Sequence, residues 1–130
     1  MTFVNTPLNY TGSKFKLLDQ IIPHFDRSKK YFVDLFCGGG SVFTNVVDLY
    51  EKIIVNDIII DLVNIHKSLT DGDIEFVSRV KELSSNKDDK QKYLDLRTSY
   101  NKEKTPEKLF ALMLSCTNNM MRFNNSFEFN

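Results

Sequence analysis

Residues 31–41 read YFVDLFCGGGS, and this stretch is the strongest indication of the fold class. Residues 31–36 are mostly aromatic, aliphatic or β-branched, and the run is too short for a helix, so it predicts a buried strand. Residues 38–40 are all glycine and predict a tight turn. Ser41 is a residue type that begins helices, so we expect a helix over residues 41–49 with its apolar side chains along one face.

The next apolar run, KIIVN at residues 52–56, predicts a second strand, which Asp57 closes. Residues 58–69 carry isoleucine and leucine at helical spacing and predict a helix. Strand, turn, helix, strand and helix in this order form a βαβ unit, so we expect a parallel sheet and an α/β fold. Before this unit, a helix is expected from Ser13 to about residue 22, where Pro23 ends it.

The pattern changes after Thr70. Residues 71–73 form a break, and helical patterns then follow around residues 76–83, 93–100 and 105–116. Phe127 and Phe129 alternate with polar neighbours, as at the start of a strand. We therefore expect two parts: residues 1–70 as a ligand-binding core and residues 71–130 as a largely helical insertion.

Composition excludes several classes. The chain has 17 basic and 17 acidic side chains, so the broad positive surface of many nucleic-acid binders is absent and any DNA contact must be local. Its two cysteines, Cys37 and Cys116, form neither a disulfide framework nor a metal pair, which favours a reducing, cytoplasmic setting. Residues His24 and His66 lack metal-ligand spacing, so we expect surface or helix-end positions and no metal. There is no membrane-spanning run and no signal peptide.

The glycine turn is the candidate ligand site. Ligands of open α/β sheets bind outside the carboxyl ends of the strands, where glycines let them approach the backbone. Asp57, at the end of the second strand, can accept hydrogen bonds from both hydroxyls of a ribose. These features indicate a site for an adenosine-containing cofactor. The alternative is structural: the glycines form only a tight turn and Asp57 only caps a helix.

The kind of cofactor follows from what the turn lacks. A dinucleotide motif would place its third glycine at position 43, which is Phe43, and the phosphate-loop signature with its lysine is absent. Asp34, inside the first strand, would repel a pyrophosphate. It suits a ligand that carries an ammonium and a sulfonium, which is S-adenosylmethionine.

Four motifs in order resemble those of the Dam family of DNA adenine-N6 methyltransferases. They are Y-T-G-S-K at residues 10–14, D-L-F-C-G-G-G-S at 34–41, N-D at 56–57, and N-N-M-M-R-F-N at 118–124 followed by F-E-F-N at 127–130. The resemblance covers the whole chain. It implies a Rossmann-like methyltransferase fold, S-adenosyl-L-methionine as cofactor and double-stranded DNA as substrate, in a setting such as restriction-modification.

The resemblance also implies roles for individual residues. Tyr10 and Lys14 would contact the methionine part of the cofactor, with Lys14 meeting the carboxylate and Asp34 facing the amino group. Asp57 would hold the ribose, and Ile58 would pack on the adenine ring. The remaining members would shape the pocket wall or approach DNA: Phe36, Gly38 and Gly40 for the wall, and Met120, Arg122 and Asn124 for DNA.

The family's catalytic Asp-Pro-Pro-Tyr motif is missing. The three prolines, Pro7, Pro23 and Pro106, are not adjacent, so we assign no catalytic residue and expect an incomplete parallel sheet. The chain is then either a part of such an enzyme, inactive without its carboxyl-terminal half, or a non-catalytic module that binds cofactor or DNA. A generic Rossmann-type nucleotide binder is a third alternative.

Overall fold

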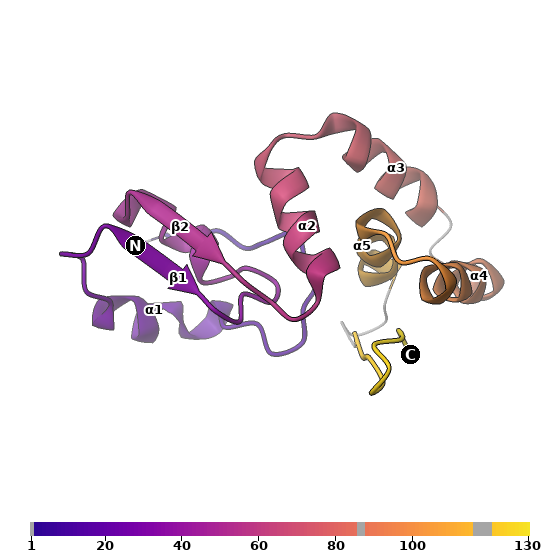
Figure 1. Ribbon diagram of the computed structural model, residues 1–130, viewed down its shortest axis with the longest axis horizontal. Helices are drawn as coiled ribbons and strands as arrows, with labels where there is room; N and C mark the ends of the chain where they lie inside the picture. Colours follow the sequence, from indigo (N-terminus) through magenta and orange to yellow (C-terminus); the bar gives the residue numbers. More distant parts are fainter. Residues whose placement is uncertain (1, 86–87, 116–120) are drawn as a thin grey trace.

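The computed structural model describes residues 2–85, 88–115 and 121–130. They form a mixed α/β structure with a two-stranded sheet and helices α1 to α5. Figure 1 shows the sheet and α1 at one end of the molecule and α3, α4 and α5 at the other, with α2 between them. The α/β class expected from the sequence is therefore confirmed.

The two strands lie where the sequence predicts them. Strand β1 spans Tyr31–Asp34 and β2 spans Lys52–Val55, and they pair in parallel with Tyr31 opposite Lys52 and Asp34 opposite Val55. Beyond the regular strands, the Asn56 N–H donates to the Asp34 carbonyl at 2.8 Å. This bond keeps the carboxyl ends of the two strands together, which brings the glycine turn next to the end of β2.

The helix expected after the glycine turn is not an α-helix. Two short 3-10 turns, Phe43–Asn45 and Val47–Leu49, replace it, and Ser41 does not cap either of them. Several residues here are β-branched and favour helices poorly. In addition, the Asn45 side-chain amide donates to the Ser41 carbonyl at 2.8 Å, in place of a backbone bond four residues apart.

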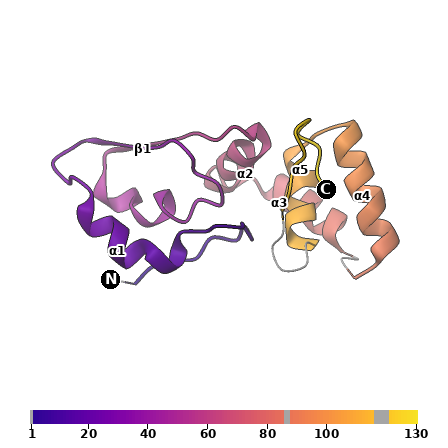
Figure 2. The same ribbon diagram turned by 90° about the horizontal axis from the view of Figure 1, so that it is seen from below.

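One face of the sheet is covered and the other is bare. The N-terminal helix is irregular: 3-10 turns at Phe15–Leu17 and Ile22–His24 flank α1, Leu18–Ile21. Leu18 and Val46 pack with Phe32 of β1, so α1 and the 3-10 turns lie on the same side of the sheet, as Figure 2 shows. On the opposite face Tyr31 and Val33 are exposed.

The remaining helices form a second core. Helix α2 spans Ile60–Thr70, α3 Ile74–Ser84, α4 Lys90–Lys102 and α5 Pro106–Ser115. Thr105 begins α5 as expected, because its hydroxyl accepts the Lys108 N–H at 3.3 Å. Helix α5 is buried among the other three, and its core includes Leu62 and Ile65 of α2. Helix α2 thus packs in the helical core, and it also lies next to the end of the sheet.

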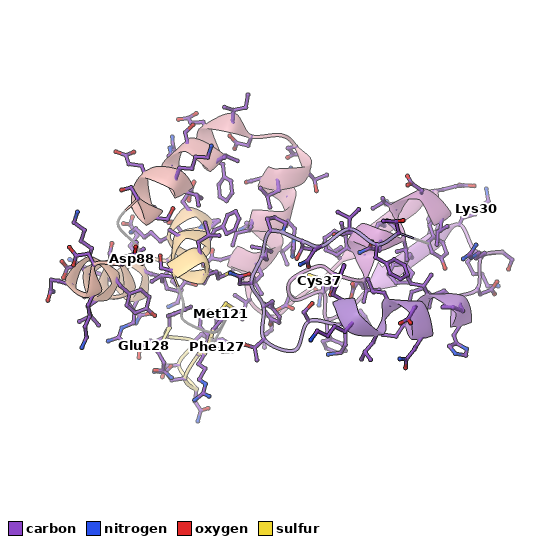
Figure 3. The ribbon with its side chains drawn as sticks, turned by 180° about the vertical axis from the view of Figure 1, so that it is seen from behind. Lys30, Cys37, Asp88, Met121, Phe127 and Glu128 are labelled. Atoms are coloured by element: carbon purple, nitrogen blue, oxygen red, sulfur yellow. The ribbon has the colours of Figure 1, made fainter. Side chains whose placement is uncertain are left out.

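Residues 121–130 form a tight hairpin-like turn. Phe123 and Phe129 make an isolated antiparallel bridge, where the sequence predicts the start of a strand. The Asn101 side chain of α4 donates to the Phe129 carbonyl at 3.0 Å and accepts its N–H at 2.8 Å. This pair of bonds fixes the turn on the helical core, and Figure 3 labels Met121, Phe127 and Glu128 of the turn beside the helices.

Candidate functional site

A cavity of about 450 Å³ lies at the carboxyl ends of β1 and β2, a size typical of small-molecule sites. In Figure 3, Lys30 marks the outer end of the sheet and Cys37 its inner end toward the helices, where the cavity opens. Seven of the residues predicted to bind cofactor line it: Tyr10, Lys14, Asp34, Phe36, Gly38, Asp57 and Ile58. Segments far apart in the sequence therefore meet at one place.

Asp34 contributes a carboxylate that lacks one partner. Its Oδ2 atom is buried and accepts no hydrogen bond within the described part of the chain. Burial raises the pKa of Asp34, although backbone N–H groups of Phe36 and Phe43 act in the opposite direction. The surroundings as a whole therefore disfavour the negative charge, and a cationic donor in the cavity would relieve this.

The N-terminal segment supplies the opposite wall. The Lys14 ammonium group donates to the Gly12 carbonyl at 2.6 Å, which holds its positive charge at the cavity. The Tyr10 ring lies against the glycine turn, and burial, followed by the charge of Asp57, raises the pKa of its hydroxyl. Tyr10 is thus a neutral hydrogen-bonding group between the cavity and the turn.

Asp57 connects the glycine turn to the segment after β2. Its Oδ2 atom accepts the Gly38 N–H at 3.0 Å, and its Oδ1 atom accepts the Ile59 N–H at 3.0 Å. The N-cap of α2 is Ile59, so Asp57 does not cap that helix. Each carboxylate oxygen retains a second lone pair, so Asp57 can still accept from a ligand.

The apolar part of the site is exposed at the cavity edge. Phe36 is 88% exposed and Ile58 is 78% exposed, and both line the cavity. Such exposure of large apolar side chains in one place is typical of a binding surface.

Gly40 is not among the residues that line the cavity, and its role in shaping the pocket wall remains a prediction. A Cβ atom at Gly40 would lie 2.7 Å from His66 and 2.7 Å from Phe43, so Gly40 lies behind the wall against these two rings. Its φ of +83° also favours glycine.

Two residues that sequence reasoning missed hold the site together. The expectation of a surface or helix-end position for His66 is wrong, because His66 is 7% exposed and its Nε2 atom lies 2.8 Å from the Gly38 carbonyl oxygen. The sequence contains a signal for this burial, since His66 follows Leu62 by four residues and so lies beside the apolar face of α2. The Ser41 hydroxyl accepts the Lys14 N–H at 3.2 Å, which links the turn to the N-terminal segment.

Cys37 is buried at the same turn and is not a nucleophile. Burial, followed by the charges of Asp57 and Asp34, raises the pKa of its thiol to about 12. The reactive form of cysteine is the thiolate. The site therefore offers hydrogen bonds and charge without a reactive sulfur.

Two of the residues expected to approach DNA, Arg122 and Asn124, do not line this cavity. Arg122 is exposed on the C-terminal turn. The Asn124 side chain accepts the N–H groups of Ser126 and Glu128, both at 2.9 Å, so it shapes the turn. Met120 lies outside the described residues. The roles of all three in DNA contact remain predictions.

Two classes of feature are not found in residues 2–85, 88–115 and 121–130. No group of three or more His, Cys, Asp or Glu side chains is arranged to hold a metal ion. No helix in these segments has the length and apolar character needed to cross a bilayer.

Known proteins resemble the chain over nearly its whole length. Residues 10–130 match the family described as D12 class N6 adenine-specific DNA methyltransferase. The chain is 37% identical to the type II methyltransferase M.FokI of Planomicrobium okeanokoites and 35% identical to the modification methylase StsI of Streptococcus sanguinis, over 99% and 98% of its length. It is 31% identical to the DNA adenine methylase of Serratia marcescens over 95%.

These relatives are longer. The chain spans 20% of the first two and 46% of the third. The family match nevertheless begins at Tyr10, the first cavity residue, and includes the glycine turn, the end of β2 and the C-terminal turn. The cavity residues thus all fall within the matched segment, and the chain belongs to the D12 class of N6 adenine-specific DNA methyltransferases.

Proposed function

We propose that the cavity at the ends of β1 and β2 binds S-adenosylmethionine, as the cofactor end of a DNA adenine-N6 methyltransferase. The observation that carries this proposal is the buried Oδ2 atom of Asp34, which accepts no hydrogen bond from the described residues and belongs to a cavity that Lys14 also lines. A ligand with an ammonium group for Asp34 and a carboxylate for Lys14 would satisfy both. The methionine part of S-adenosylmethionine carries these two groups.

The other end of the cavity fits the adenosine part. Asp57 has free lone pairs for ribose hydroxyls, and the exposed Ile58 offers an apolar surface to a purine ring. S-adenosylmethionine would supply the electrophilic methyl group. The residues of this chain bind and orient the cofactor on both sides of its sulfonium.

A pyrophosphate-containing ligand fits poorly. Asp34 and Asp57 both line the cavity, and two carboxylates would repel the phosphates of NAD or ATP. The α-helix whose N-terminus would bind phosphates is replaced by 3-10 turns. Both observations favour a cofactor without phosphate.

The wider enzyme is also a proposal. Methyl transfer to adenine in double-stranded DNA would need the carboxyl-terminal part that the longer relatives contain. The parallel pairing of β1 and β2 and the cavity at their carboxyl ends support a larger Rossmann-like sheet. Within it, residues 1–70 would bind cofactor, and residues 71–130 would lead to the DNA contact made by Arg122.

Calorimetry of the 130-residue chain with a set of ligands tests the cofactor assignment. We expect S-adenosylmethionine and its demethylated product S-adenosylhomocysteine to bind, and NAD and ATP not to bind. Tight NAD binding that Asp57→Ala abolishes would refute the proposal.

A matched lysine pair tests the placement of the methionine part. Lys14→Met should weaken the binding of S-adenosylmethionine about 1.5- to fivefold, as expected for the loss of an exposed ion pair. It should leave 5′-methylthioadenosine unchanged, because that ligand lacks the carboxylate. Lys16→Met is the control, since Lys16 is exposed nearby and does not line the cavity. Equal losses for both ligands would place Lys14 elsewhere.

A further inference from the structure

His66 joins helix α2 to the glycine turn. It lies on α2 beside Ile65, which belongs to the helical core with α3 and α5. Its ring is buried, and its Nε2 atom lies 2.8 Å from the Gly38 carbonyl oxygen. A side chain anchored in the helical core therefore reaches the backbone of the proposed cofactor site.

The hydrogen bond fixes the protonation of the ring. A carbonyl oxygen can only accept, so Nε2 must carry the hydrogen. Burial lowers the pKa of His66, although the Gly38 bond and the charges of Asp57 and Asp34 act in the opposite direction. The imidazole is thus neutral near pH 7, with the hydrogen on Nε2 and none on Nδ1.

Gly38 is held at both of its polar groups. Its N–H donates to Asp57 and its carbonyl accepts from His66. Its φ is +47°, in the left-handed region that costs little only for glycine. Two bonds from different elements therefore determine the orientation of one peptide segment at the cavity wall.

The ring also explains why residue 40 is glycine. His66 and Phe43 meet edge to face, with ring centroids 4.9 Å apart. A Cβ atom on residue 40 would lie 2.7 Å from each of these rings. Gly40 therefore leaves room for His66, and the turn and the histidine fit as one unit.

We propose that His66 is a positioning residue that orients the glycine turn for cofactor binding and connects it to the helical core. The inference rests on the proposed function, because the ligand is taken to be S-adenosylmethionine. His66 need not touch the ligand, since it does not line the cavity. It acts through the Gly38 carbonyl.

Two variants separate the hydrogen bond from the shape of the ring. His66→Phe keeps an aromatic ring against Phe43 and removes the donor. His66→Gln removes the ring and can place an amide N–H where Nε2 lies. His24→Gln is the control, because it removes an exposed imidazole that does not line the cavity.

The first measurement is amide exchange at residues 37–40 of the full chain without ligand. His66→Phe should raise exchange about two- to tenfold, the effect of one lost hydrogen bond, and His66→Gln should restore most of the protection. The second measurement is the affinity for S-adenosylmethionine, which should fall in His66→Phe and largely recover in His66→Gln. If His66→Phe does not melt cooperatively, His66→Leu takes its place.

The outcomes are distinguishable. If the wild-type chain binds no S-adenosylmethionine, the proposed function fails, and exchange alone still tests His66. If His66→Phe shows the same amide exchange and the same affinity for S-adenosylmethionine as the wild-type chain, the inference is overturned. Equal losses in His66→Phe and His66→Gln would overturn it as well, because a hydrogen-bond donor placed where Nε2 lies would then restore nothing.

Discussion

Replacing Asp34 by asparagine should stabilise the chain and weaken the binding of its proposed ligand, S-adenosylmethionine. Asp34→Asn keeps the size of the side chain and removes its charge. Burial raises the pKa of Asp34, so the folded state disfavours the ionised form. An unsatisfied buried polar group costs about 1–3 kcal/mol, and more when it is charged. Asparagine keeps a polar atom at this position, so only the part of the cost that comes from the charge is removed, and we take the lower limit. We expect the free energy of unfolding to rise by about 1 kcal/mol, or Tm by about 3–5 °C.

The pH dependence has a definite sign. A carboxyl whose pKa is higher in the folded state than its ordinary 3.8 binds protons more readily when folded. Its stabilising effect is thus present at low pH and is lost as pH rises through the raised pKa. The difference in free energy of unfolding between Asp34→Asn and the wild-type chain should therefore grow from pH 3.8 upward. It should become constant once Asp34 is fully ionised.

Ligand affinity should change in the opposite direction. A hydrogen bond to a charged group contributes about 1.5–3 kcal/mol, so S-adenosylmethionine should bind about 10- to 150-fold more weakly. Thermal unfolding between pH 3.5 and 8 and calorimetry at pH 7.5 are the assays. Asp19→Asn is the control, because it removes the same charge from an exposed site on α1. A variant that loses stability at neutral pH, or binds the ligand as wild type does, would refute the reasoning.

Three further predictions concern the helical core, the C-terminal turn and the sheet. The Tyr100 hydroxyl donates to Asp61 at 2.9 Å in a buried pair. Tyr100→Phe should therefore lower the free energy of unfolding in urea by about 1–3 kcal/mol. A loss below about 0.5 kcal/mol, the lower limit for a net hydrogen bond, would show that water takes the place of the tyrosine hydroxyl. Arg122→Ala should weaken residual DNA binding by about 1–3 kcal/mol in a fluorescence titration and leave cofactor affinity unchanged; an unfolded variant would mean that Arg122 is structural. In the described residues β1 has one partner strand, so its other edge is unpaired. An unpaired apolar edge favours association, so the isolated chain should self-associate in sedimentation experiments. Co-expression with the carboxyl-terminal part of a longer relative should make it monomeric. A monomer with strong amide protection on both edges of β1 would contradict this.

The amino-acid sequence is sufficient for the parts of this protein that depend on local pattern. The short apolar runs predict β1 and β2, and helical spacing predicts α2 to α5 within a few residues. Because parallel strands end at the same edge of a sheet, the sequence alone also places Asp34, Gly38 and Asp57 close together. These predictions succeed because the spacing of apolar side chains along a strand or helix can be read from residues that are neighbours in the sequence.

The way in which the glycine turn is held depends instead on tertiary contacts. The segment after it reads as a helix, but the Asn45 amide takes the Ser41 carbonyl and the backbone forms 3-10 turns. His66 has no motif, yet α2 brings it within 2.8 Å of the Gly38 carbonyl oxygen. The His66–Gly38 contact joins residues 28 positions apart in the sequence, and it depends on how α2 packs between the sheet and the helical core. No local period encodes that packing.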